Sequence, residues 1–299
     1  MPVVLVVGVA VMDFVFFVDE MPAKPEKYRA LDAAITGGGC AANAAFAIAR
    51  LGGATRLAGR LGDDAVAELI EADLRDARID TSGLRRHAGH RSSFSSVYVD
   101  RAGERQIMNF RDHSLPRAPD WLRELDFADV AAVLADTRWA EGATEAMRIA
   151  RERGIPGVLD GEAPFDGSEE AVRLASHVAF SAQGLRAYAK GGDLSECLHG
   201  LTVEPNQFVC VTDGARDVLW RMEPEKGAIP AFPVSPVETL GAGDLWHGAF
   251  AMRLAAGAGE SDAIHFANAA AALKCTRTGG RQSYPTLAEV ETFLLERQA

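Results

Sequence analysis

Val3-Val4-Leu5-Val6-Val7 is a continuous run of mainly β-branched residues that Gly8 brings to an end. Because every position is apolar, the run is typical of a central strand that is covered on both faces. Runs of this kind recur at 130–135, 157–159, 177–180 and 208–212, and helical patterns such as 144–153 and 169–175 separate them. Strands that alternate with helices at this spacing predict βαβ units, and therefore a mainly parallel sheet between two helical layers.

Two stretches, 14–35 and 91–110, interrupt this alternation. In the second, segments 94–99 and 105–110 flank the turn Asp100-Arg101-Ala102-Gly103-Glu104, which predicts a β-hairpin. Their partial alternation of apolar and polar residues suggests a small sheet with one face against a cleft or a partner subunit. No long Pro- or Gly-rich linker divides the chain, so we expect one domain over residues 1–299 with the small sheet as an inserted lid.

The composition is that of an ordinary globular protein, with 299 residues, 48% of them hydrophobic and 24% charged, and a net charge of −11. This acidic balance argues against a nucleic-acid partner, although a few Arg and Lys side chains could still bind one small anion. The four cysteines contain no CxxC pair, which favours reduced thiols over a disulfide framework or a zinc site. No apolar stretch reaches the roughly 20 residues of a membrane span, and we expect a cytoplasmic protein.

The segment Glu238-Thr239-Leu240-Gly241-Ala242-Gly243-Asp244 is a glycine-rich turn that opens an apolar helical pattern and ends in a carboxylate. Backbone N–H groups at a helix N-terminus converge on anions, so Gly241, Ala242 and Gly243 could bind a phosphate. Asp244 would then lie beside that phosphate and could take a proton from an attacking hydroxyl. The alternative is an ordinary strand-to-helix turn with Asp244 as a first-turn dipole partner. A dinucleotide fingerprint would need glycine in place of Trp246, and no P-loop Gly-Lys-Ser/Thr is present.

Two segments near the start of the chain could bind a sugar. Asp13 follows the first strand, at a place where a carboxylate can bond two sugar hydroxyls. Gly37-Gly38-Gly39-Cys40-Ala41-Ala42-Asn43 leads into an alanine-rich helix. Gly38 and Gly39 would allow a ligand close to the backbone, and Asn43 offers both a donor and an acceptor. A flexible turn followed by a first-turn Asn is the alternative.

Two segments later in the chain could bind a nucleotide. Thr212 and Gly214 belong to a turn that follows a buried strand. A helix of small residues, which contains Asn268 and Cys275, leads to a second glycine turn at Gly279. Its alanines would leave room for a flat ring such as adenine, although close helix packing would explain the same alanines.

Taken in order, these pieces resemble the ribokinase-like family of carbohydrate kinases, often called the PfkB family. The resemblance covers nearly the whole chain and rests on 8–13, 37–43, 60–64, 212–214 and, most specifically, Thr-Leu-Gly-Ala-Gly-Asp at 239–244. It implies a ribokinase-like three-layer α/β/α fold with a small β-sheet lid, and ATP and Mg²⁺ as cofactors. It further implies an anion hole at Gly241, Ala242 and Gly243 with Asp244 as the base, sugar contacts at Asp13, Gly38, Gly39 and Asn43, and nucleotide contacts at Thr212 and Gly214.

One departure from the family concerns the metal. Where the family often carries Asn-x-x-Glu to organise Mg²⁺ and phosphates, this chain reads Ser181-Ala182-Gln183-Gly184. The Mg²⁺ ligands are therefore unassigned, with Asp160 and Glu162 as candidates beside phosphates and water. The departure also leaves open a sugar-binding protein that has lost catalysis, although the intact Asp244 argues against it.

Within the family, several blocks are similar to the bacterial sulfofructose kinases; they lie at 26–28, 107–110, 133–139, 159–161, 179–181, 246–249 and 272–277. This likeness implies that Lys27, Asn109 and Arg138 hold a sulfonate, whose three oxygens and one negative charge suit two cations and an amide. Solvated charges and a polar lid-strand residue are the alternative.

The sequence thus predicts an ATP-dependent kinase that phosphorylates the C1 hydroxyl of a ketose, with 6-deoxy-6-sulfofructose as the leading substrate. The alternative substrates are fructose and other unsulfonated or phosphorylated sugars. The apolar lid also predicts a homodimer.

Overall fold

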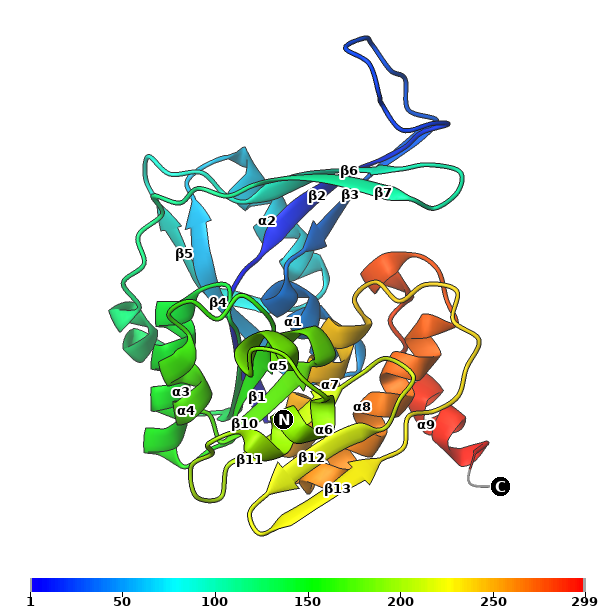
Figure 1. Ribbon diagram of the computed structural model, residues 1–299. Helices are drawn as coiled ribbons and strands as arrows, with labels where there is room; N and C mark the ends of the chain where they lie inside the picture. Colours follow the sequence, from blue (N-terminus) through cyan, green and yellow to red (C-terminus); the bar gives the residue numbers. More distant parts are fainter. Residues whose placement is uncertain (1, 298–299) are drawn as a thin grey trace.

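A nine-stranded sheet forms the middle layer of the protein, shown in Figure 1 as a computed structural model that describes residues 2–297. From one edge to the other its strands are β13 (Glu225–Ile229), β12 (Val218–Met222), β11 (Phe208–Thr212), β10 (His177–Ser181), β9 (Gly157–Gly161), β8 (Val130–Asp136), β1 (Val3–Val7), β4 (Ala54–Gly62) and β5 (Asp80–His87). Neighbouring strands from β5 to β11 pair in parallel, whereas β12 and β13 pair antiparallel. The expected mainly parallel sheet is confirmed.

Helices cover both faces of this sheet (Figure 1). One layer contains α1 (Cys40–Arg50), α2 (Ala65–Asp76), α7 (Ala242–Ala255), α8 (Glu260–Cys275) and α9 (Leu287–Leu295); the other contains α3 (Ala140–Arg153), α4 (Glu169–Leu174), α5 (Ala182–Tyr188) and α6 (Leu194–Gly200). Two 3₁₀ turns, η1 (Asp120–Glu124) and η2 (Gly280–Ser283), complete the helical elements described.

Strand β1 is buried on both of its faces, which explains why every one of its residues is apolar. Val4 and Val6 face the first helical layer, Leu5 and Val7 face the second, and each is at most 1% exposed. A strand buried on both faces needs apolar side chains on both. The three-layer α/β/α prediction is therefore confirmed. Among the residues described, no helix is long and apolar enough to cross a membrane.

A separate four-stranded sheet lies across the top of the body in Figure 1, with its strands in the order β3 (Asp32–Gly38), β2 (Val11–Phe17), β6 (Phe94–Val99) and β7 (Arg105–Phe110). The expected hairpin is present as β6 and β7, which pair antiparallel. Because β2 begins at Val11 and β3 ends at Gly38, the sheet is longer at both ends than the stretch 14–35. Between β2 and β3, the loop 18–31 projects away from the body. We call this sheet with its loop the lid.

Candidate active site

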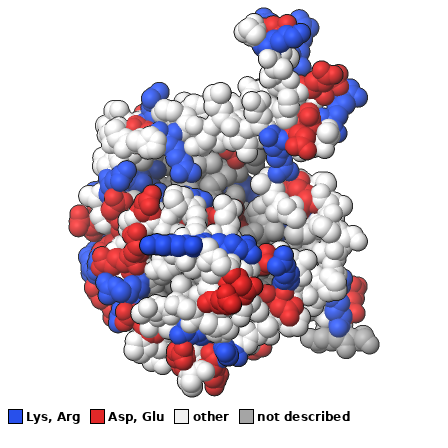
Figure 2. Space-filling view, viewed as in Figure 1, with Lys and Arg blue, Asp and Glu red and all other residues white. Residues whose placement is uncertain are grey.

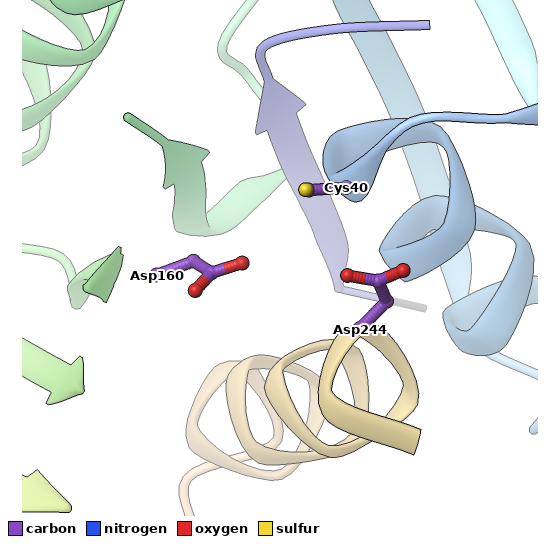
Figure 3. Close-up of side chains that lie close together, drawn as sticks. All are labelled: Cys40, Asp160 and Asp244. Carbon is purple, nitrogen blue, oxygen red and sulfur yellow. The ribbon is translucent and has the colours of Figure 1, made fainter. Parts of the chain in front are cut away.

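The ends of β8 and β9 and the first turns of α1 and α7 meet beneath the lid. Cys40 begins α1, Asp160 lies near the end of β9, and Asp244 lies in the first turn of α7, and their ligand atoms all lie within 4.8 Å of one another. Figure 3 shows these three side chains pointing toward one another, and in Figure 2 the surface is hollowed between lid and body. Ligands of open parallel sheets bind beyond the carboxyl ends of the strands, so this cluster marks the candidate site.

Asp244 is placed by the turn before α7 and held by Asn43. Gly241 has a φ of 73°, a left-handed conformation that favours glycine and lets the chain turn into the helix. Asn43 Nδ2 donates to Asp244 Oδ2 over 2.8 Å, so the expected base and an expected sugar contact are neighbours. Burial and then the charge of Asp160 raise the pKa of Asp244 to about 7, against the opposing effects of Asn43 and His247. Such a carboxylate can accept a proton near neutral pH.

Two of the amide groups at the start of α7, those of Gly243 and Asp244, have no backbone partner among the described residues. In the part of the chain that the structure describes, Ala242 N–H bonds the Thr239 carbonyl, but no carbonyl accepts from the N–H groups of Gly243 and Asp244. A Cβ atom on Gly243 would meet no atom within 4 Å, so the space beside this residue is open. The arrangement suits an anion at a helix N-terminus.

Asp136, at the end of β8, is a residue of this region to which sequence reasoning gave no role. Its Oδ2 accepts hydrogen bonds from the amides of Val9 (2.9 Å) and Ala41 (3.1 Å), and its Oδ1 accepts from the amide of Arg138 (2.9 Å). Gly8, with a φ of 154°, is needed here because a Cβ atom would lie 2.3 Å from Asp136 Oδ2. Burial raises the pKa of Asp136 to about 6, against these hydrogen bonds. The only sequence signal was an acidic residue at the end of an apolar strand.

Three polar residues form a row across the lid strands. Asp13 on β2 lies opposite Ser95 on β6, which lies opposite Asn109 on β7. Asn109 Nδ2 donates to Ser95 Oγ over 3.1 Å. Burial raises the pKa of Asp13, and a hydrogen bond with Ser95 opposes this shift. Opposite residues share a face of a sheet, so the row joins two expected substrate contacts, Asp13 and Asn109, through a serine that sequence reasoning missed.

The triple glycine joins the lid to the body. A Cβ atom on Gly38 would lie 2.5 Å from Asp13 Oδ2. Gly39 has a φ of 96°, and a Cβ atom there would lie 2.5 Å from the Val9 carbonyl oxygen. The chain's own packing therefore requires these glycines, whether or not a ligand approaches them.

The two cations expected to hold a sulfonate lie in different places. Arg138 follows β8, is half-buried, and donates from its guanidinium to the Ala163 carbonyl. Its amide donates to Asp136 Oδ1 over 2.9 Å, which places it beside a carboxylate of the site. Burial raises the pKa of Asp160, and the positive charge of Arg138 opposes this rise. Lys27 is exposed in the loop 18–31, which projects away from the body in Figure 1. Within one chain, the structure does not bring the two cations together.

Four expected nucleotide contacts lie at the ends of elements. Thr212 ends β11, and Gly214 follows it with a φ of 60°. Cys275 ends α8, and its carbonyl accepts a hydrogen bond from the amide of Glu238 over 3.3 Å. Gly279, with a φ of 111°, donates from its amide to Glu238 Oε2 over 3.2 Å. Cys275 and Gly279 therefore border the glycine-rich turn that starts at Glu238.

Asn268, the fifth expected nucleotide contact, lies in the middle of α8 and is only 6% exposed. Its Oδ1 accepts from Trp246 Nε1 over 2.8 Å, and its Nδ2 donates to the Pro230 carbonyl over 3.0 Å. This side chain links α8 to α7 and to the segment after β13. These two hydrogen bonds occupy the side chain within the chain itself, and its role in nucleotide binding stays a prediction.

A family model for the pfkB carbohydrate kinases matches residues 1–287. The chain belongs to this family. It is similar to the fructokinase of Vibrio alginolyticus, with 30% identity over 86% of this chain and 91% of that protein. It is also similar to the ribokinase of Bacillus subtilis (strain 168), with 27% identity over 97% of this chain and 99% of that protein.

Solved structures agree with this membership. The fructokinase of Xylella fastidiosa with bound ATP has a TM-score of 0.80 to this chain, with 25% identity and 99% of both chains covered. This pfkB family member is therefore an ATP-dependent sugar kinase with the ribokinase-like fold.

The rise in the pKa of Asp244 predicts how this pfkB kinase responds to pH. We expect kcat/KM, which reports on the free enzyme, to fall as the pH drops below about 7, because a protonated carboxyl cannot accept a proton. Asp160→Asn should move the midpoint to lower pH, since the charge of Asp160 contributes to the rise. The exposed Asp166→Asn should leave the midpoint unchanged. A profile that is flat through neutral pH, or an unmoved midpoint in Asp160→Asn, would contradict this account.

Proposed function

We propose that this kinase phosphorylates the C1 hydroxyl of a ketose that carries an anionic group at its other end, with 6-deoxy-6-sulfofructose as the leading substrate. The observation that carries the proposal is Arg138, a half-buried cation beside the carboxylates of the site. A sulfonate would give this cation a charge-assisted hydrogen bond. Asn109, in the polar row of the lid, supplies an amide donor for the same group.

Asp244 acts as the base in the proposed reaction. It accepts the proton of the C1 hydroxyl while the hydroxyl oxygen forms a bond to the γ-phosphorus of ATP and the bond to the β-phosphate oxygen breaks, which releases ADP. The amides at the start of α7 stabilise charge on the transferred phosphoryl group. Asn43 holds the Asp244 carboxylate, and its buried Oδ1, which has no partner among the described residues, can accept a hydrogen bond from a sugar hydroxyl. Closure of the lid would exclude water, a competing acceptor.

Mg²⁺ is the expected metal, and the side chain that best suits it is Asp160. This residue is 7% exposed, and its carboxylate accepts no side-chain hydrogen bond among the residues described, with His247 Nε2 at 3.5 Å. Carboxylate oxygen is a ligand that Mg²⁺ prefers, whereas the neighbouring Cys40 thiol suits softer metals. When bound there, Mg²⁺ would neutralise charge on the phosphates of ATP.

Arg138→Ala tests the choice of sugar. It should lower kcat/KM for sulfofructose by about 10–100-fold, since a lost charge-assisted hydrogen bond costs about 1.5–3 kcal/mol. Fructose has no anionic tail, so its kcat/KM should change by less than about tenfold in the same variant. Arg105→Ala, which removes an exposed arginine from lid strand β7, is the matched control and should affect neither sugar. Equal losses on both sugars would show that Arg138 only braces the Ala163 carbonyl or contacts the shared ring.

Fructose is the second candidate substrate, and the similarity to the fructokinase of Vibrio alginolyticus favours it. Lys27 lies exposed in the loop 18–31, which projects away from the body, so the sulfonate proposal rests within one chain on Arg138 and Asn109. Comparing kcat/KM for sulfofructose, fructose and fructose 6-phosphate decides between the candidates. A preference for fructose in the wild-type enzyme would reject the anionic tail.

The kinase acts as a homodimer that joins through the lid. Four large apolar side chains of the lid are at least 59% exposed, namely Leu31, Ile35, Ile107 and Met108. Ile35 and Met108 lie on the same face of the sheet, in the row Ile35, Phe14, Ser96 and Met108, whereas Ile107 lies on the opposite face. An exposed apolar face is typical of an interface. The double variant Ile35→Glu and Met108→Glu should halve the mass measured by light scattering, whereas Leu295→Glu, on α9, should leave it unchanged. A wild-type mass of one chain would reject the dimer.

A further inference from the structure

Lys274, in the last turn of α8, has a fully buried side chain with 0% exposure. Its Nζ donates to Glu238 Oε1 over 2.9 Å and to the Glu238 carbonyl oxygen over 3.1 Å. Taking an ammonium group out of water is costly unless the charge is paired. The proposed chemistry does not use this cation, so its position close to the site calls for an explanation.

Glu238 connects the cation to two further segments. Its carboxylate accepts hydrogen bonds from the amides of Gly279 (3.2 Å) and Gly280 (2.9 Å), while its own amide donates to the Cys275 carbonyl. Burial alone would raise the pKa of Glu238, but the Lys274 ammonium and these two amides outweigh burial and lower it. The Glu238 carboxylate is therefore ionised at neutral pH. It ties the end of α8, the turn at 279–280 and the start of the glycine-rich turn to one point.

The glycine-rich turn is fixed at its other end by a neutral contact. The hydroxyl of Tyr284, a fully buried residue, donates to the Gly241 carbonyl over 2.7 Å. Between these two anchors, the Thr239 carbonyl accepts the Ala242 amide over 3.2 Å. Donors aimed at a transition state act through their fixed geometry, and a misplacement of about 1 Å can cost on the order of 10²-fold in rate. The anchor at Glu238 therefore bears on catalysis without touching the substrate.

We propose that Lys274 is a built-in cation that holds the 238–243 turn in its phosphate-binding shape. It is a positioning residue, and it acts through the Glu238 carboxylate and carbonyl oxygens. Such a pair of oxygens would also suit a small free cation, and the tethered ammonium makes a free one unnecessary. The proposal rests on the role of the amides at the start of α7 in phosphoryl transfer, and not on the identity of the sugar.

A pair of variants at this position tests the proposal. Lys274→Ala leaves a space beside Glu238, whereas Lys274→Met removes the charge but fills that space. Both should lower kcat by about 10²-fold with KM values for ATP and sugar within about threefold, because the turn is misplaced after binding. Ammonium chloride should restore turnover of Lys274→Ala in a dose-dependent way, but not of Lys274→Met. The wild-type enzyme and the exposed Lys226→Ala control should not respond to the salt.

Removal of a buried cation leaves Glu238 unpaired and can unfold a protein, so circular dichroism accompanies each assay. If the single variants do not fold, the double variant Glu238→Gln with Lys274→Met removes both charges. The proposal then expects a folded enzyme with kcat still reduced at least tenfold. Wild-type kcat in any folded variant without Lys274, or a folded Lys274→Ala that ammonium fails to restore, would overturn the proposal. Failure of the sulfofructose assignment would leave all these results unchanged, because they can be measured with whichever sugar the wild type uses.

Discussion

Asp244→Asn should lower kcat by on the order of 10²–10⁴, which is the usual contribution of a positioned general base. The amide keeps the shape of the carboxylate and can still contact Asn43, but it cannot accept the proton of the hydroxyl. Sugar and ATP should therefore bind within a few-fold of wild-type affinity. Steady-state turnover and calorimetric titration of each substrate measure the two effects separately.

The same substitution should stabilise the folded protein at neutral pH. Burial raises the pKa of Asp244 to about 7 in the folded state. A carboxyl group with a raised pKa costs stability above its ordinary range, because the unfolded chain ionises more readily there. The Tm of Asp244→Asn should thus exceed that of wild type at pH 8, and the difference should shrink as the pH approaches 4.

Asp262→Asn is the matched control for Asp244→Asn. Asp262 also lies in the first turn of a helix, α8, but it is exposed to solvent. If Asp244 served only as a partner of the helix dipole, the two substitutions would have similar small effects on turnover. Near wild-type kcat in Asp244→Asn would reject its role as the base.

Gly243→Val should abolish most of the activity and leave the fold intact. Position 243 lies inside α7 without a left-handed φ, and a Cβ atom there would meet nothing within 4 Å. Valine can therefore adopt the backbone angles of this position, and we do not expect the substitution to unfold the protein. The added methyl groups would occupy the space that a phosphate needs beside the helix amides, so we expect a loss of about 10²–10³ in kcat.

Gly241→Val separates packing from catalysis. Gly241 has a φ of 73°, and a Cβ atom there would lie 2.4 Å from the Tyr284 hydroxyl oxygen. This variant should lose thermal stability, whereas Gly243→Val should melt near the wild-type temperature. A Gly243→Val enzyme that is folded and fully active would show that the phosphate does not approach the helix at this position.

The central sheet could be predicted from the sequence because a strand that is buried on both faces consists of consecutive apolar residues. The run Val3 to Val7 has no polar position, and the structure buries both of its faces. The β6–β7 hairpin was also readable, since its turn residues lie between two apolar segments. Asp244 and its glycines were found for the same reason, because a helix N-terminus gathers its donors within a few consecutive residues.

Features of the site that depend on contacts between distant segments could not be predicted from the sequence. Ser95 joins Asp13 and Asn109 only because of strand register, and register depends on which strands become neighbours. Asp136 accepts hydrogen bonds from an amide after β1 and an amide in the first turn of α1, and no local sequence pattern predicts such partners. The hydrogen bond between Asn268 on α8 and Trp246 on α7 is another such contact, because it joins residues 22 positions apart in the sequence. The position of Lys274 near the end of a helix likewise gives no sign in the sequence that its side chain is buried and bonded to Glu238.

The row across the lid has an evolutionary consequence. Asp13, Ser95 and Asn109 lie on lid strands, whereas Asp244 and the amides beside it belong to the body. The proposed sugar contacts at Asp13 and Asn109 and the proposed transfer machinery therefore sit on different sheets and helices of one chain. Substitutions on the lid can alter these two sugar contacts while Asp244 keeps its chemistry, although Arg138 and Asn43, which also bear on the sugar, belong to the body. Such a division would allow a family of kinases to widen its range of sugar substrates while one ancestral mechanism is kept.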